Sequence, residues 1–121
     1  MSRNLTIALD AMGGDDAPDM VINGAALVLK SIDNLSFIFA GDEARLRPLI
    51  DKHAKLSKKS TIIHTPDVVP SDMKPGVALR QGRNSSMRLA INAVAEGKAD
   101  AVLSAGNTGA LMAMAKFVLK T

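Results

Sequence analysis

Short apolar runs alternate along this chain with longer segments whose apolar residues recur every three or four positions. Four of the runs have the length of strands buried within a sheet. They cover residues 5–9, 35–40, 61–64 and 101–103. The segment after the first run has the widened apolar stripe of a helix lying on a sheet. Its members are Val21, Ile22, Ala25, Ala26, Val28, Leu29 and Ile32.

Polar caps and prolines predict the next elements. Asp42 can cap a second helix that runs to about residue 54. Pro48 lies inside that helix, and an interior proline predicts either a kink or a later start near Arg47. Residues 66–77 hold three prolines and are expected to form a loop.

Asn84 or Ser85 can cap a third helix, and Gly97 is placed to end it. Its buried stripe is formed by Met87, Ile91 and Val94. A last helix follows residues 104–109 and runs to the end of the chain.

Strands that alternate with helices are typical of a doubly wound, mostly parallel sheet. We therefore expect residues 1–121 to form a single α/β domain with four parallel strands. The glycine-rich loops after the first and last strands should lie at the same, carboxyl edge of that sheet. Ligands bind there at the point where strand order reverses, and we expect four strands to provide only one side of that crevice.

Composition narrows the classes of function. The chain has no Cys, Trp or Tyr, which excludes disulfides, thiolate zinc sites and thiol nucleophiles and leaves few aromatic platforms for nucleic acid bases. The net charge of +3 would help an acidic partner to dock. Neither a signal peptide nor an apolar run of roughly 18 residues is present, and the two histidines lack metal-ligand spacing. We expect a cytoplasmic protein without a metal or a nucleic acid partner.

The strongest chemical motif lies between the last strand and the last helix. Its candidate ligand-binding residues are Ser104, Gly106, Asn107, Thr108 and Gly109. Glycines let a ligand approach the backbone, and the first N–H groups of a helix point toward it. The loop holds no carboxylate, so it predicts an anion site, and phosphate is the expected ligand. The alternative is a plain turn in which Thr108 caps the helix.

The loop after the first strand combines two glycines, Gly13 and Gly14, with three carboxylates, Asp10, Asp15 and Asp16. Three negative charges make it a poor phosphate cradle. One carboxylate can instead satisfy a helix N-terminus, and another can orient a hydroxyl, a lysine or a cation. The alternative is that the loop only forms a turn and a cap.

A third candidate region leads into the third helix. Arg80 or Arg83 could reach an anion there, and the hydroxyls of Ser85 and Ser86 lie near free helical N–H groups. The alternative is solvated arginines beside an ordinary cap.

In this order, the motifs resemble those of the PlsX family of phosphate acyltransferases. Residues 7–15, Ile-Ala-Leu-Asp-Ala-Met-Gly-Gly-Asp, are similar to its N-terminal signature, and residues 99–112 are similar to a second signature. The resemblance covers nearly all of the chain. Lys74 departs from the acidic or small residue usual at that place, which argues against a catalytic role for this position.

The resemblance implies a fold similar to that of isocitrate and isopropylmalate dehydrogenases. It implies transfer of a fatty acyl group from acyl carrier protein to inorganic phosphate, giving acyl phosphate for phospholipid synthesis. It also implies a homodimer of longer chains, no cofactor, and peripheral association with the membrane. Asp10, Asp15 and Asn107 are the candidate catalytic residues.

Two alternatives stay open. One is a phosphate acetyltransferase-like or decarboxylating-dehydrogenase-like enzyme on a related fold. The other is an inactive anion-binding module. Because the chain stops at Thr121 near a helix without a capping glycine, we expect a fragment of a longer enzyme that is inactive alone.

Overall fold

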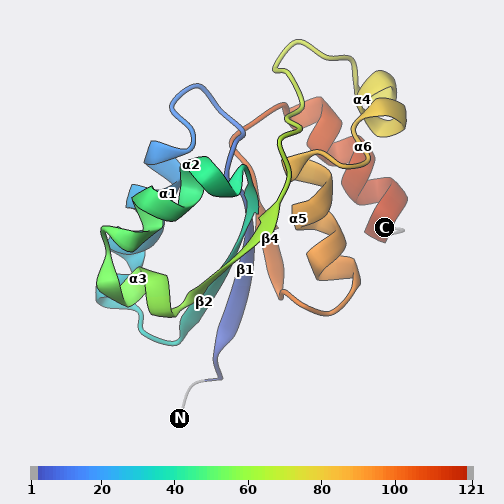
Figure 1. Ribbon diagram of the computed structural model, residues 1–121. Coiled ribbons are helices and arrows are strands. Elements are labelled where there is room, and N and C mark those ends of the chain that lie inside the picture. Colours follow the sequence, from blue (N-terminus) through green and yellow to red (C-terminus); the bar gives the residue numbers. More distant parts are fainter. Residues whose placement is uncertain (1–2, 120–121) are drawn as a thin grey trace.

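The computed structural model describes residues 3–119 and shows one parallel sheet between two layers of helices (Figure 1). The strands are β1 (Leu5–Asp10), β2 (Leu35–Gly41), β3 (Ser60–His64) and β4 (Ala101–Leu103). The helices are α1 (Asp19–Ser31), α2 (Glu43–Asp51), α3 (Ala54–Lys58), α4 (Pro75–Gln81), α5 (Ser86–Ala95) and α6 (Thr108–Leu119). Every strand pairing is parallel. The predicted α/β fold with a doubly wound, parallel sheet is confirmed.

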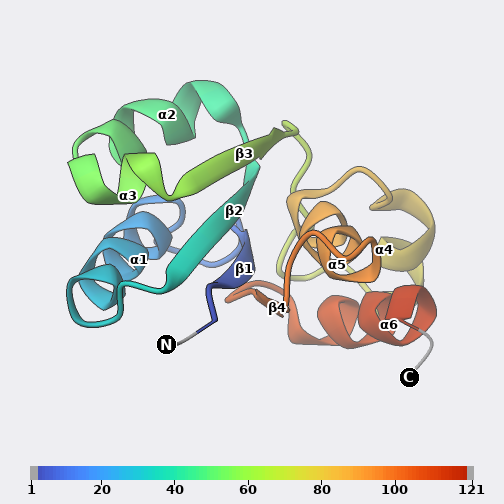
Figure 2. The ribbon, with the colours of Figure 1, turned by 90° about the horizontal axis from the view of Figure 1, so that it is seen from below.

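Helices α1, α2 and α3 cover one face of the sheet (Figure 2). Alternate side chains of β1 and β2 point into this layer, among them Leu9, Phe37 and Phe39. Burial of aliphatic and aromatic side chains between helix and sheet is the main source of stability in such a layer.

Helix α5 covers the opposite face, where Ala90 and Ala93 pack against Ala8, Ile38 and Ala40. The small alanines let α5 approach the strands closely.

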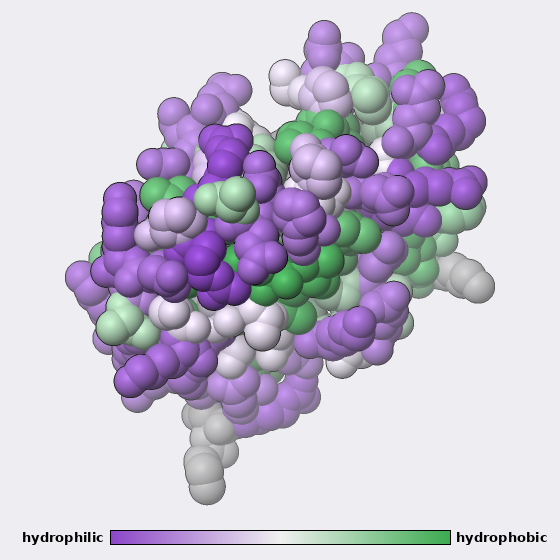
Figure 3. Space-filling model, in the orientation of Figure 1, coloured by the Kyte–Doolittle hydropathy of each residue, from purple (hydrophilic) through white to green (hydrophobic). Residues whose placement is uncertain are grey.

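In Figure 3 hydrophobic surface lies near the middle of the face shown, with hydrophilic side chains around it. Helix α6 packs beside α5, since Ala110 and Met114 belong to one buried cluster with Met87 and Ile91.

The strand order is β3-β2-β1-β4. The chain runs from β1 outward through β2 to β3 and then returns to place β4 on the other side of β1. The reversal therefore lies between β1 and β4, inside this chain. Our expectation that four strands provide only one side of the crevice is wrong, because both loops that flank the reversal are present.

The first helical stripe is rotated from the predicted one. Ile22, Ala25, Ala26 and Leu29 are buried, as the widened stripe requires. Val28 remains 43% exposed, because it faces a surface groove beside α1.

The C-terminal end of α1 also differs from the prediction. Ile32 follows the last helical residue as the C-cap and is 46% exposed.

Pro48 is accommodated inside α2, so the predicted start near Arg47 is wrong. Asp42 caps the helix, with its carboxylate accepting a hydrogen bond from the N–H of Ala44 at 3.1 Å. This cap and the burial of Leu46 and Ile50 offset the donor that proline lacks.

The predicted second helix does not run unbroken to residue 54. Helix α2 ends at Asp51, and α3 begins separately at Ala54.

Helix α4 begins at Pro75, within the stretch that was expected to be loop. Proline suits the first helical position, where its missing N–H is not needed. Ser85, one of the two predicted caps, is the N-cap of α5, and Gly97 follows that helix with a φ of +77°. Within residues 3–119 no helix is long and apolar enough to cross a bilayer.

Candidate functional site

The loops after β1 and β4 meet at the carboxyl edge of the sheet. A Cβ atom added to Gly13 would lie 3.2 Å from the Cα of Gly106. The two backbones thus touch where any side chain would separate them. This confirms the prediction that both glycine loops lie together at one edge.

Asp10, at the end of β1, is buried and links three elements around this contact. Its carboxylate accepts hydrogen bonds from the hydroxyl of Ser86 at 2.5 Å and from the hydroxyl of Ser104 at 2.9 Å. The backbone N–H of Met12 donates to it as well, at 3.2 Å. With three donors on it, the carboxylate is placed to hold α5, β1 and β4 in register.

Ser104 connects Asp10 to the loop after β4. Its Oγ donates to Asp10 and accepts a hydrogen bond from the backbone N–H of Gly106 at 3.1 Å. The loop after β4 is therefore fixed in position by a chain of hydrogen bonds that begins at a buried carboxylate.

Asn107 caps α6. Its Oδ1 accepts from the N–H of Ala110 at 3.1 Å, and its Nδ2 donates to the carbonyls of Met73 at 2.7 Å and Pro70 at 3.1 Å. These bonds fasten the loop after β3 onto the loop after β4. The cap is thus Asn107, in place of the Thr108 considered above, whose side chain lies outside the described residues.

The cap formed by Asn107 reduces the number of backbone N–H groups that an anion could contact at the start of α6. The N–H of Ala110 already has a partner, and a Cβ on Gly109 would lie 2.8 Å from the Cγ of Pro75, so that helical turn is covered. The opposite side of the start of α6, along residues 105–107, borders a cavity.

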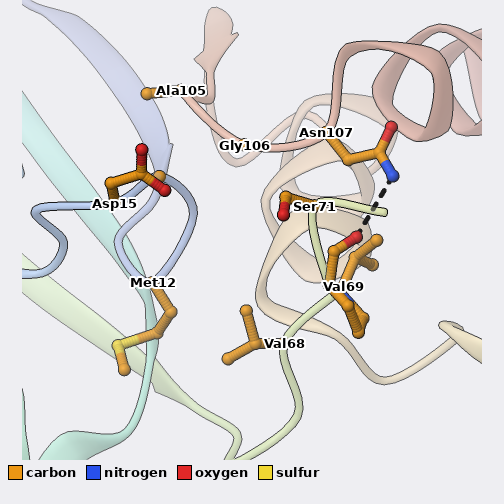
Figure 4. Close-up of a pocket in the computed structure, with 10 residues that line it drawn as sticks. Met12, Asp15, Val68, Val69, Ser71, Ala105, Gly106 and Asn107 are labelled. Atoms are coloured by element: carbon orange, nitrogen blue, oxygen red, sulfur yellow. Dashed lines mark hydrogen bonds between the residues drawn. The ribbon is translucent and has the colours of Figure 1, made fainter. Parts of the chain in front are cut away.

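A cavity of about 370 Å³ opens on that side (Figure 4). It is lined by Met12, Gly14, Asp15, Val68, Val69, Pro70, Ser71, Ala105, Gly106 and Asn107. Three loops form its walls, after β1, β3 and β4. Figure 4 shows Asp15 and Met12 on one wall, with Val68, Val69 and Ser71 across the cavity. Gly14 has a φ of +101°, which favours glycine, and it lies against Ala105.

Several predicted site residues lie elsewhere. Arg80 is exposed in the last turn of α4 and does not line the cavity. Ser85 is buried as a cap, with its hydroxyl donating to the carbonyl of Gly82 at 2.6 Å. Ser86 reaches the site only through Asp10. Both serine hydroxyls thus donate to groups within the protein, and a role of Arg80 or Arg83 in binding an anion stays a prediction.

The wall formed by residues 68–71 was not anticipated from the sequence. A usable signal was present, because the loop after β3 must also emerge at the carboxyl edge of a parallel sheet. Asp15 is the charged side chain among the residues that line the cavity, and it is exposed.

Comparison with known proteins gives concordant results. A family model described as "fatty acid synthesis protein" matches residues 5–121. The chain is 64% identical over 121 residues to a phosphate acyltransferase of Rhodospirillum centenum. The aligned region covers 100% of this chain and 34% of that protein. It is 53% identical to the phosphate acyltransferase of Rhodospirillum rubrum, with 35% of that protein covered. The chain thus spans about a third of the length of these curated relatives.

Proposed function

The chain belongs to the family of fatty acid synthesis proteins, and on this premise we propose that a protein of the relatives' length containing it transfers a fatty acyl group to inorganic phosphate. The acyl donor is acyl carrier protein, and the product is acyl phosphate for phospholipid synthesis. The observation that carries the proposal is the cavity between two glycine loops at the strand reversal. The name shared by the relatives favours this reaction over acetyl transfer or oxidative decarboxylation.

The reaction needs no protein nucleophile. An oxygen of hydrogen phosphate attacks the thioester carbonyl and the carbon–sulfur bond breaks. The proton of the hydrogen phosphate goes to the sulfur, so that the carrier leaves as a thiol. The protein must hold the phosphate close to the carbonyl and stabilise the oxyanion that forms. The absence of cysteine from the sequence is compatible with this chemistry.

The described residues supply positioning. Ala105, Gly106 and Asn107 line the cavity, and Asp10 holds their loop through Ser104, whose Oγ accepts the hydrogen bond of the Gly106 N–H. We assign Asp10 a positioning role, because its carboxylate is buried under three donors. Asp15 puts negative charge at the cavity, so the cation that balances phosphate comes from outside the lining residues.

Asn107 is likewise assigned to positioning, since both ends of its amide have backbone partners. Homodimer formation, cytoplasmic location and peripheral contact with the membrane stay predictions from the resemblance.

Acyl phosphate formation from acyl carrier protein and phosphate tests the proposal. We expect turnover by a family-length protein, made by joining residues 1–121 to the remainder of the Rhodospirillum centenum relative, and none by the 121-residue chain alone. Catalysis needs reacting groups held to within about 1 Å of their productive positions. In addition, the residues that line the cavity include no lysine or arginine to balance the charge of phosphate.

The relative itself serves as the positive control. Comparable turnover by the short chain would place all essential residues within it and contradict the expectation that residues 1–121 are inactive alone. A family-length protein that acylates phosphate only from small acyl thioesters would overturn the assigned donor.

A further inference from the structure

The outer edge of β4 is apolar and open. Strands of a parallel sheet are ordinarily buried on both faces, yet Leu103 is 57% exposed. Within residues 3–119 no strand pairs with the side of β4 that faces away from β1. The opposite edge strand differs in composition, because β3 carries Ser60, Thr61 and His64. Polar residues protect an exposed edge, and β4 has none.

An apolar groove of about 520 Å³ runs beside this edge, between β4 and α1. Met20 and Val28 on α1 line it and are 57% and 43% exposed. Leu103 closes the groove on the sheet side. A continuous apolar surface of this kind marks a place where other polypeptide packs.

The handedness of the crossovers indicates where the chain goes after α6. Parallel strands are joined by right-handed crossovers in nearly all proteins. The crossover through α1 lies on one face and moves from β1 toward β2. The crossover through α5 lies on the other face and moves the opposite way, from β3 past β1 to β4.

Helix α6 lies on the same face as α5. Val102 of β4 packs against the cluster that contains Ala110 and Met114 of α6, and also against the cluster that contains Ala90 of α5. Figure 2 shows α5 and α6 together, across the sheet from α1. A right-handed crossover through α6 therefore delivers the next strand to the outer side of β4.

We propose that, in a chain of the relatives' length, the segment following α6 adds a parallel strand to the free edge of β4 and that the continuing chain covers the groove between β4 and α1. The relatives are about three times as long as these 121 residues, so they contain ample chain for this. The strand order becomes β3-β2-β1-β4 followed by the new strand. This inference rests on family membership and geometry and is independent of the proposed reaction.

Amide hydrogen exchange tests the added strand. The 121-residue chain is compared with the same residues joined to the remainder of the Rhodospirillum centenum relative. We expect the β4 amides that point away from β1 to exchange more than about tenfold more slowly in the longer protein, relative to the amides of central strand β2. Normalising to β2 removes any general gain in stability.

An unchanged ratio of exchange rates would overturn the proposal. Protection of β4 in the short chain that depends on its concentration, with no further gain in the long protein, would assign the edge to a second copy and would overturn it too.

A matched pair of variants tests the groove. Leu103→Lys puts a charge on the proposed interface, whereas Leu27→Lys changes a leucine of α1 that is 66% exposed and does not line the groove. We expect Leu103→Lys to lower Tm by several degrees in the longer protein and by less than about 2 °C in the short chain. Leu27→Lys should have small effects in both. Small effects of Leu103→Lys in both proteins would contradict burial of the groove.

Discussion

Replacing Asp10 by alanine is expected to lower the free energy of unfolding by about 3 kcal/mol, because it leaves three donors without an acceptor. The donors are the hydroxyls of Ser86 and Ser104 and the N–H of Met12. The residue is only 2% exposed, so water cannot readily replace the carboxylate. Urea unfolding of the wild-type chain and the variant measures the loss.

Asp10→Asn is the matched control. The amide keeps the shape and one acceptor oxygen, and a serine hydroxyl can rotate to accept from its NH₂ group, so the loss should be clearly smaller than for alanine. Equal, small losses of less than about 1 kcal/mol for both variants would show that the hydrogen bonds to Asp10 contribute little to stability. The assignment of Asp10 as the residue that positions the site would then be wrong.

Replacing Gly13 by alanine is expected to cost about 2–3 kcal/mol of stability and to push the two glycine loops apart. The added Cβ would lie 2.5 Å from an Oδ atom of Asp10 and 3.2 Å from the Cα of Gly106. Both neighbours are held in place, the first by its three donors and the second by Ser104. Thermal unfolding reports the loss of stability, and a weaker affinity for inorganic phosphate in a family-length protein reports the separation of the loops.

Gly24→Ala provides the comparison. Gly24 lies inside α1, and an added Cβ would meet nothing within 4 Å, so alanine should stabilise the chain by about 0.5–1 kcal/mol. If Gly13→Ala is as well tolerated as Gly24→Ala, the close contact between the loops does not matter for stability. The two loops would then be neighbours without mutual support.

The fold was largely predictable because its signals are local. Apolar runs bounded by polar residues gave strands close to those observed, and β4 has the predicted bounds of 101–103. Parallel pairing then requires the loops after β1 and β4 to emerge at one edge, so the sequence predicts Gly13 and Gly106 on the same side, and their contact confirms it.

The partners of the site residues were less predictable, because they come from distant segments. Nothing near Asn107 in the sequence indicates that its amide binds the carbonyls of Met73 and Pro70. Ser86 reaches Asp10 across 76 positions of the chain. Local pattern shows that a residue can cap or donate, while the tertiary fold decides which group receives the bond.

The same limit applies to the arginines. The sequence predicted Arg80 in the segment that leads to the third helix, whose start looked suitable for an anion. Arg80 instead lies in the last turn of α4, a helix that the sequence did not predict, and it is exposed and does not line the cavity.

The central claim is that the cavity between the two glycine loops binds the phosphate that accepts the acyl group. The most direct measurement is the crystal structure of a family-length protein with inorganic phosphate, at a concentration that saturates acyl phosphate formation. Our account predicts phosphate density inside this cavity, against the backbone of residues 105–107 and beside Gly14. Phosphate bound at another site, with this cavity empty, would contradict it.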